Sequence, residues 1–520
     1  MKKIFFFAAL LIGAQSFAQN YEAGYLKTLV DEQADASKGT TQLYNLEYAA
    51  DGSLYLLSMY QTASSAEVGL NFDGKTYQGA TATKWGSKVG DFNYTNMRNS
   101  FLAKLDAEGN LLWAKADTTG DYDLASTALA VTNDGGVIYA DKFRTRKAVY
   151  MGFINVYDKN GQLLGSNSMS FTNKDSVEVD GKKVFRKEAF NWAGVTMDKD
   201  SFIYLTGVQT DTLLPVWNDS LAPRKAWTEK SGGINTSKGN TFVLKYKLQP
   251  GSWPDVAYTK GVINSDELDY DRPLALHLED GKLYIVGTYG KGDEKGIYAA
   301  RYNTNLEREF IVYHPINATL QFQQTKFADG KIYICGGAQK GSITVGEKTI
   351  TAAGTMNNGF VYIIDQETGK ALDFDIQGKE KELHITVAAL PTEEGLVAYH
   401  YGPMGTNIAI NYNNKLEVVS VDTLATGGGS STLTVVGRSA DGKQTAVGLR
   451  AGKNKDFNVL GETFSFSTTN WYSVLATLNE KEETTAIEDV QKDNVQSTKF
   501  IRNGQLIIRH NGREYNVLGF

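Results

Sequence analysis

Cysteine is almost absent from this 520-residue sequence, in which Cys335 stands alone. One cysteine cannot form an internal disulfide, so a disulfide framework is excluded. Cys335 lies in a strand-like stretch, KIYICGG, and we expect a buried small hydrophobic side chain there rather than a nucleophile. Proline is also scarce, with 8 residues against 52 glycines, and amphipathic helical periodicity of any length is missing. The chain is therefore expected to consist of strands and tight turns.

An excess of basic residues is also lacking. The net charge is −6 and the pI is about 5.6, which argues against a nucleic-acid partner. There is no phosphate-binding glycine loop, no G-x-S-x-G, no cysteine pair and no H-E-x-x-H. The five histidines are dispersed, and we expect each to be structural or exposed: His277, His314, His384, His400 and His510.

Long apolar runs are missing except at the start of the chain. Residues 1–18 combine Lys2 and Lys3, a short apolar run, and small residues at Ser16 and Ala18. This is the pattern of a secretory signal peptide, and the run is too short for a mature transmembrane helix. We therefore expect an exported protein without a transmembrane segment, located in the periplasm, at the cell surface or outside the cell.

What the chain has in abundance is one repeated pair of β-hairpins. One half of the repeat reads LEYAADGSLYLLS, LALHLEDGKLYIVG and TKFADGKIYICGG, and the other reads FLAKLDAEGNLLWAK and MGFINVYDKNGQLL. Asp-Gly and Asn-Gly supply the positive φ angles that tight hairpins need. About seven copies of four strands predict an all-β fold, a β-propeller with probably seven four-stranded blades.

The last copy is incomplete. Its first three strands, up to WYSVLATL, are followed directly by the polar run NEKEETTAIED. Because Tyr25–Val30 is a strand-like segment without a place in the first copy, we predict that it supplies the missing outer strand and closes the ring. If it does not, residues 21–32 form a free arm. The predicted organisation is a signal peptide (1–18), a propeller (19–480), a polar linker (481–497) and a short β-meander tail (498–520).

The repeats resemble a bacterial family of β-propeller repeats common in secreted proteins. The resemblance is carried by residues 101–115, 128–140 and 194–207, and by glycine-centred inserts such as LNFDGKTY, VGEKTITAAGT and LGETFSFST. It implies an architecture and no particular chemistry. The tail, KFIRNGQLIIRHNGREYNVLGF, resembles the end of the type IX secretion sorting domain of Bacteroidetes proteins, although it is shorter and lacks a basic finish. The alternative is a meander that is inert or serves only for docking.

Candidate ligand-binding residues lie in the connections between successive copies, which a propeller brings to one face. They are aromatic-acidic clusters and a tryptophan: Asp121, Tyr122 and Asp123; Trp192; and Asp266, Glu267, Asp269, Tyr270, Asp271 and Arg272. Carboxylates brought together could hold Ca²⁺ or act as an acid/base pair. The alternative is that these loops are simply solvated. No other cofactor is expected.

Two further regions are candidates. Tyr48, His277, Lys326 and Arg438 share one repeat position on the opposite face, where they could favour an anionic ligand or merely reach water. The long connections 61–99 and 208–240 carry Trp85, Trp217 and Trp227, which could stack on sugar rings or pack the loops onto the blades.

Three functions remain open. The first is a monomeric binding protein of the cell envelope that recognises a glycan or a protein through its loop-rich face. The second is a glycan-cleaving hydrolase or lyase, which requires two carboxylates about 5 to 10 Å apart in a pocket. The third is a purely structural envelope protein, which predicts no pocket at the axis of the propeller.

Overall fold

A computed structural model shows how the chain folds. It describes residues 21–31, 40–63, 69–77, 88–89, 92–93, 96–116, 128–144, 150–171, 176–179, 182–185, 190–209, 213–216, 219–221, 239–248, 251–252, 258–265, 267–352, 354, 356–378, 383–429, 431–452, 455–466, 471–480, 497–502, 505–510 and 513–515. Within these ranges the structure is made of β-strands, with a single 3-10 turn at Pro403–Gly405. No helix among the described residues is long and apolar enough to cross a membrane.

The chain forms two compact units. One is Ala23–Asn479, and the other combines Met1–Glu22 with Glu480–Phe520. The second contains an antiparallel three-stranded meander made of β41 (Ser497–Arg502), β42 (Gln505–His510) and β43 (Arg513–Tyr515). The rest of this subsection concerns the first unit.

Five sheets of the first unit share one plan: four main strands follow one another in chain order, each antiparallel to the last. Their strands are β10 (Ala128–Val131), β11 (Val137–Arg144), β12 (Tyr150–Tyr157) and β13 (Leu163–Phe171); β16 (Phe190–Met197), β17 (Phe202–Gln209), β20 (Asn240–Lys247) and β22 (Tyr258–Ile263); β23 (Tyr270–Glu279), β24 (Lys282–Lys291), β25 (Glu294–Asn303) and β26 (Arg308–Pro315); β27 (Asn317–Ala328), β28 (Lys331–Val345), β30 (Asn358–Asp365) and β31 (Ala371–Gln377); and β32 (Ile385–Thr392), β33 (Gly395–Tyr401), β34 (Asn407–Asn413) and β35 (Val418–Gly427).

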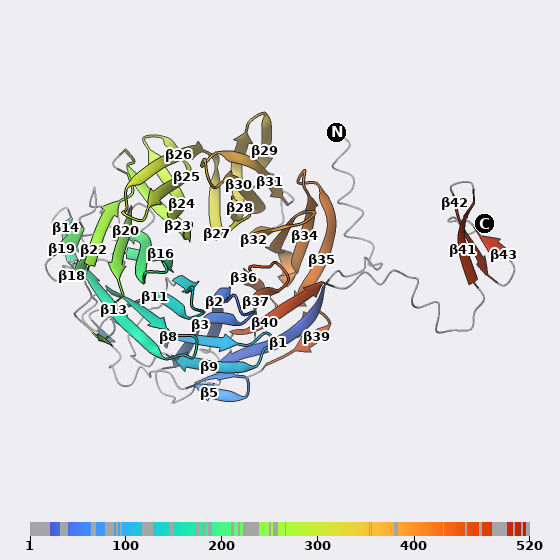
Figure 1. The fold of residues 1–520 in the computed structure, drawn as a ribbon, viewed down its shortest axis with the longest axis horizontal. Helices are drawn as coiled ribbons and strands as arrows, with labels where there is room; N and C mark the ends of the chain where they lie inside the picture. The colour runs from blue at the N-terminus through green and yellow to red at the C-terminus, as the bar shows by residue number, and fades with distance from the viewer. Residues whose placement is uncertain are drawn as a thin grey trace. The chain divides into compact units, whose positions relative to one another are not determined.

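A sixth, ten-stranded sheet joins the two ends of this unit. One part is β2 (Thr40–Tyr48), β3 (Leu54–Ala63), β8 (Asn96–Leu105) and β9 (Leu111–Ala116). The other is β36 (Thr432–Arg438), β37 (Thr445–Gly452), β40 (Trp471–Glu480) and the N-terminal strand β1 (Tyr21–Asp31). The two parts meet through one parallel pairing, between Thr40 and Trp471. The sheets surround a common centre, with β2, β16, β23, β27, β32 and β36 innermost (Figure 1). The fold is an all-β propeller.

β1 occupies the position predicted for it, beside β40. The Tyr25 amide donates to Thr477 Oγ1 at 2.8 Å, and Leu29 is fully buried among residues of the ten-stranded sheet. Tyr25 also meets the next part of the sheet, because a Cβ on Gly109 would lie 2.6 Å from its ring. β1 thus serves as the fourth main strand of this part of the sheet and leaves β40 without an open edge.

The same contact recurs between other neighbouring sheets. Gly161, in the turn after β12, faces the ring of Trp113 in β9, and Gly369, in the turn after β30, faces Phe310 in β26. Both glycines have positive φ, at 81° and 69°. Since only glycine adopts this conformation cheaply and leaves room for the ring, each turn can dock on the outer strand of the preceding sheet. Tyr25 therefore stands where Trp113 and Phe310 stand elsewhere.

Short hairpins extend several outer edges. β4 (Leu70–Phe72) and β5 (Lys75–Tyr77) pair onto β1, β38 (Phe457–Val459) and β39 (Glu462–Phe464) pair onto β35, and β18 (Leu213–Val216) and β19 (Asp219–Leu221) pair onto β13. Each lies in a connection between a second and a third strand. The hairpins β18–β19 and β38–β39 cross to the preceding sheet, and β4–β5 crosses to the other part of the ten-stranded sheet. The remaining short strands are β21 (Gly251–Ser252), paired with β13; β29 (Lys348–Ala352), paired with β28; and the hairpins β6 (Lys88–Val89) with β7 (Phe92–Asn93) and β14 (Ser176–Val179) with β15 (Lys182–Phe185).

The core lies between adjacent sheets. Ile138 and Ile154 of one sheet pack with Ile203, Leu205 and Phe242 of the next, and all five are buried. Cys335 is fully buried, as predicted, and burial raises the pKa of its thiol, which keeps it protonated.

Candidate functional site

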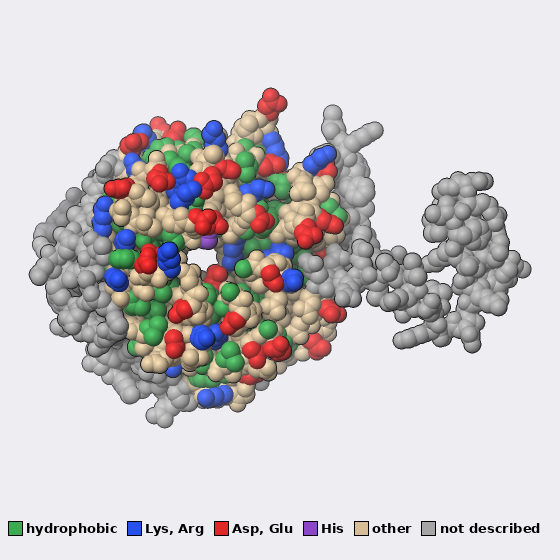
Figure 2. Space-filling model, in the orientation of Figure 1, with side chains coloured by type: hydrophobic (Ala, Val, Ile, Leu, Met, Phe, Trp, Pro, Cys, Tyr) green, Lys and Arg blue, Asp and Glu red, His purple; other side chains and the backbone are tan. Residues whose placement is uncertain are grey.

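The hairpin plan gives the first unit two distinct faces. We call the loop face the one that carries the connections between successive sheets and those between second and third strands. The turn face carries the other two hairpin turns of each sheet. Asp269, which precedes β23, accepts a hydrogen bond from the Gly292 amide in the β24–β25 turn at 2.6 Å, so both kinds of loop-face connection meet there. Figure 2 shows one side of the ring, with an opening at its centre.

Several predicted site residues lie outside the described residues. These are Asp121, Tyr122, Asp123 and Asp266, together with Trp85, Trp217 and Trp227 of the long connections. Their assignment to a ligand stays a prediction. Parts of both long connections are described, however, and they include two of the short hairpins that extend the outer sheet edges, β4–β5 and β18–β19.

The described members of the acidic cluster have separate roles. Asp269 is exposed and holds the β24–β25 turn through Gly292, while the Tyr270 ring packs over Gly290. Arg272 is exposed, but Asp271 is fully buried. Because no face of the Asp271 carboxylate reaches solvent, it cannot meet a substrate or ion from outside.

Asp271 instead ties β23 to the preceding sheet. Its Oδ1 accepts from the Thr241 amide at 3.2 Å and its Oδ2 from Asn264 Nδ2 at 2.9 Å. Asn264 Oδ1 in turn accepts from the Tyr302 hydroxyl at 2.6 Å. Burial, helped by the charge of Asp271, raises the pKa of Tyr298 well above its ordinary value, so this phenol remains a donor. A buried carboxylate with several donors is a structural link between blades.

Trp192 lies in strand β16, and the prediction that it belongs to a connecting loop is wrong. Its side chain is only 5% exposed, and Nε1 donates to the Asp141 carbonyl at 2.8 Å. The ring meets Phe242 edge-on with centroids 5.9 Å apart. The register of β16 shifts between Trp192 and Gly194, an irregularity that accompanies the inward ring. A buried ring cannot stack on a sugar.

The four residues aligned on the turn face contact other protein groups. Lys326 Nζ lies 3.9 Å from Glu47 Oε1, and Arg438 donates to the carbonyls of Gly442 and Pro391 at 2.9 and 2.5 Å. The His277 ring stacks on Phe327 with centroids 4.8 Å apart. Burial raises the pKa of Tyr48, whose hydroxyl is buried. Lys326 and Arg438 therefore already contact carboxylate or carbonyl oxygens of the protein. This repeat position is better suited to holding blades together than to binding an anionic ligand.

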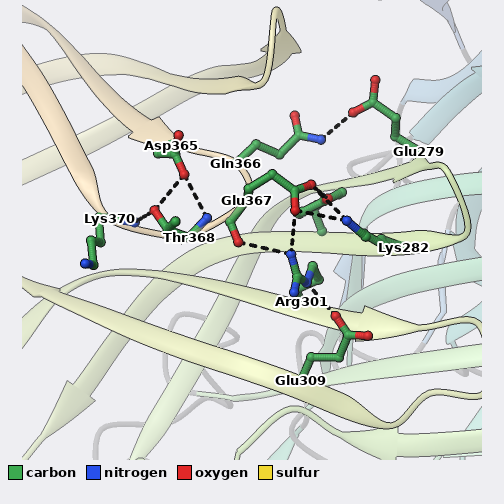
Figure 3. A network of polar contacts seen from close by, with 10 residues as sticks. Glu279, Lys282, Arg301, Glu309, Asp365, Gln366, Glu367, Thr368 and Lys370 are labelled. Atoms are coloured by element: carbon green, nitrogen blue, oxygen red, sulfur yellow. Dashed lines mark hydrogen bonds and ion pairs between the residues drawn. The ribbon is translucent and has the colours of Figure 1, made fainter.

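A cluster of charges that the sequence did not suggest lies farther out on the turn face. Glu367 accepts from Lys282 at 2.9 Å, from the Tyr284 hydroxyl at 2.6 Å and from Arg301 at 2.9 Å (Figure 3). Arg301 also donates to Glu309 at 2.5 Å. The bonds from Tyr284 and Lys282 lower the pKa of Glu367 below its ordinary value. The cluster joins β24 and β25 to the turn after β30, and its groups satisfy one another.

The loop face over β28–β35 carries features that the sequence reasoning missed. Met404, in the 3-10 turn between β33 and β34, is 90% exposed and has a φ of 56°. Met356, in the connection before β30, is 40% exposed. A non-glycine residue with positive φ is strained, and such strain concentrates at functional positions. The sequence signal was the turn Gly402-Pro403-Met404-Gly405, which places an apolar side chain at a loop tip.

Among the described residues, no group of three or more His, Cys, Asp or Glu side chains could hold a metal ion. The Ca²⁺ prediction therefore depends on Asp121, Asp123 and Asp266, which lie outside the described ranges. The same holds for a catalytic pair of carboxylates, because Asp271 is buried and Asp269 accepts a hydrogen bond from the β24–β25 turn.

Comparisons with known proteins show likeness of fold alone. No family model matches the chain, and no curated protein is similar to it in sequence. Among solved structures, the Dos1 propeller aligns over 88% of this chain and 95% of its own length, with 10% identity and a TM-score of 0.39. The C-terminal WD40 domain of Sif2 aligns over 89% and 99%, with 10% identity and a TM-score of 0.36. Cobalt-substituted apocarotenoid oxygenase of Synechocystis aligns over 78% and 95%, with 10% identity and a TM-score of 0.36.

Proposed function

We propose that this protein is an exported seven-bladed propeller that recognises a protein or glycan of the cell envelope through its loop face. The five separate sheets, each with four main strands, account for five blades. The two parts of the ten-stranded sheet, which meet through a single pairing, account for two more and bring the total to seven. Export is supported by the signal-peptide pattern of residues 1–18.

The exposure of Met404 is the observation that carries the binding proposal. Its side chain is 90% exposed at a loop tip, and its positive φ of 56° is a conformation that is found at functional positions more often than elsewhere. The turn itself is held firmly, because the Gly402 amide donates to the Thr406 carbonyl at 2.8 Å. A rigid turn that presents a flexible thioether suits a binding surface.

The chemistry of this surface favours a protein partner over a glycan. Thioethers adapt to the side chains of a partner, whereas sugar recognition relies on flat aromatic rings beside polar groups. The tryptophans that could stack on sugars are Trp85, Trp217 and Trp227, all outside the described residues. A glycan therefore stays the second class of ligand to test.

Site-specific photocrosslinking tests the protein partner. A crosslinking amino acid replaces Met404, and the control replaces Val419, which is 65% exposed on the outer strand β35 of the same sheet. After exposure to envelope extract, we expect one discrete adduct from position 404 and none from position 419. The captured protein must then bind the purified chain with an affinity that Met404→Lys weakens at least tenfold. Equal labelling from both positions, or none from position 404, would overturn the proposal.

A glycan panel tests the second class of ligand. A bound ligand raises the thermal midpoint in proportion to its concentration relative to Kd. Neutral and anionic glycans are compared over a range of concentrations, with Ca²⁺ present and absent. A flat midpoint for every glycan removes this class, while a saturable shift for one glycan replaces the protein partner as ligand.

A further inference from the structure

The opening at the centre of the ring is bordered by polar side chains that the recognition role does not use. The inner strands β2, β27 and β36 surround it (Figures 1 and 2). β27 is a neighbour of neither of the other two: β32 lies between β27 and β36, and β10, β16 and β23 lie between β2 and β27 on the other side of the ring. A contact from β27 to β2 or β36 must therefore pass through the central opening.

Two side chains of β27 make such contacts. Gln324 Oε1 accepts a hydrogen bond from the Val436 amide of β36 at 2.7 Å. Lys326 Nζ lies 3.9 Å from Glu47 Oε1 of β2. Because Gln324 and Lys326 are two residues apart on one strand, their side chains point to the same side. Both side chains therefore project into the central opening rather than between adjacent sheets.

β-bulges direct side chains of the inner strands towards the centre. The register with the second strand shifts in β27 between Phe322 and Thr325, and this shift contains Gln324. Similar shifts occur in β2, β16, β23, β32 and β36. A bulge bends a strand and redirects the side chains beside it, and bulges are frequent next to binding sites. The bulge in β27 thus explains how Gln324 reaches β36.

Glu47 presents a carboxylate that solvent can reach in this opening. Its side chain is 40% exposed, whereas that of Lys326 is 15% exposed. Burial nevertheless raises the pKa of Glu47, although the charge of Lys326 opposes this. A group that solvent reaches and protein surrounds belongs to the wall of a narrow channel. The 3.9 Å between Lys326 Nζ and Glu47 Oε1 exceeds the roughly 2.7–2.9 Å of a direct charge-assisted hydrogen bond, so both groups can still bind a ligand.

The three side chains select the class of ligand by their chemistry. Lys326 supplies donors, Glu47 supplies acceptors, and the Gln324 carboxamide supplies N–H groups because its oxygen is engaged with Val436. A cationic ligand would be repelled by Lys326, and an anionic one by Glu47. A hydroxyl group both donates and accepts, so it can bridge Lys326 and Glu47, while a second hydroxyl accepts from Gln324. A neutral molecule with several hydroxyl groups suits all three.

We propose that the central opening binds a neutral sugar through Glu47, Lys326 and Gln324. The ligand would be held by its hydroxyl groups, between β27 on one side of the opening and β2 on the other. This site is distinct from the recognition surface at Met404, which includes none of these three residues.

Calorimetric titration of the full chain with neutral hexoses and pentoses tests the site. We expect one neutral sugar to bind saturably at one site per chain, and its amino-sugar and uronate analogues to bind at least tenfold more weakly. Glu47→Gln and Lys326→Met should each weaken binding at least tenfold. The control Lys348→Met, which removes an ion pair with Asp373 in another part of the molecule, should not change it. Absence of binding, equal binding of the charged analogues, or binding that survives both substitutions would overturn the proposal.

Carboxyl footprinting of the wild-type chain gives a readout that does not depend on the variants folding. A carbodiimide couples an amine to exposed carboxylates, and mass spectrometry measures the rate at each position. The bound sugar should slow modification of Glu47 at least threefold and leave Glu309 unchanged, whose side chain is similarly exposed at 36%. A sugar that binds without protecting Glu47 occupies another place and contradicts the proposal. Circular dichroism shows whether each variant retains its β-structure.

Discussion

At the scale of single residues, burial decides which polar and aromatic side chains can serve a ligand. Trp192 and Asp271 were both singled out from the sequence, and both are buried with partners in a neighbouring strand or sheet. We expect Trp192→Phe to remove the donor to the Asp141 carbonyl and to lower the free energy of unfolding by about 1–2 kcal/mol. Thermal and urea denaturation measure this. If the substitution left stability intact and abolished binding of a ligand, the structural role would be wrong.

A second residue-scale prediction concerns pH. His314 is 7% exposed, and its Nε2 lies 2.9 Å from the Gly369 carbonyl. Burial lowers its pKa below the ordinary 6.5, although the bond to Gly369 opposes this. The unfolded chain therefore takes up the proton first, so the contribution is complete above pH 6.5 and is lost as the pH falls below it.

Unfolding midpoints measured from pH 7.5 down to 4.5 check this prediction. We expect His314→Gln to flatten the acid loss of stability relative to wild type, because glutamine cannot titrate. His510→Gln, in the separate C-terminal meander, serves as the control and should follow wild type. A His314→Gln profile parallel to that of wild type would contradict the assignment.

At the scale of elements, the turns that dock on outer strands link one blade to the next. We expect Gly161→Ala to cost about 3 kcal/mol, because a Cβ there would lie 2.8 Å from Trp113 in addition to the strain of a positive φ. Gly281→Ala is the matched control, with a φ of 73° and nothing within 4 Å of its Cβ, and should cost about 1–2 kcal/mol. Equal losses in denaturation would show that the ring contact contributes nothing.

The sequence predicts hairpin elements well, because their turns are local. Asp-Gly and Asn-Gly signals marked Gly52 and Gly161, which have positive φ, and the unassigned strand at Tyr25–Val30 was placed from an incomplete repeat. The short hairpins at the outer sheet edges could not be predicted in this way. The pairing of β4 with β1 joins segments about forty residues apart, and no local pattern encodes it.

The candidate site was less predictable for the same reason. Whether Asp271 reaches solvent depends on its packing against the neighbouring sheet, where the Thr241 amide binds it. The exposure of Met404 depends on the short 3-10 turn Pro403–Gly405, which no hairpin motif in the sequence marks.

At the scale of the whole molecule, ring closure sets the positions of all loops on the two faces. β1 contributes Leu29 to the core, and its Tyr25 receives the turn that contains Gly109. The two ends of the propeller unit are held together because they lie in one sheet. Removal of β1 should therefore expose an edge of β40 and loosen the blade that contains β40 before the others.

Hydrogen exchange of β40 tests this closure most directly. Amides of Trp471–Glu480 are compared in the full chain and in a chain that lacks residues 1–31, with β30 (Asn358–Asp365) as internal control. We predict at least about tenfold faster exchange in β40 of the shortened chain, unchanged exchange in β30, and recovery when a peptide of residues 21–31 is added. Equal protection of β40 in both chains would contradict closure of the ring by β1.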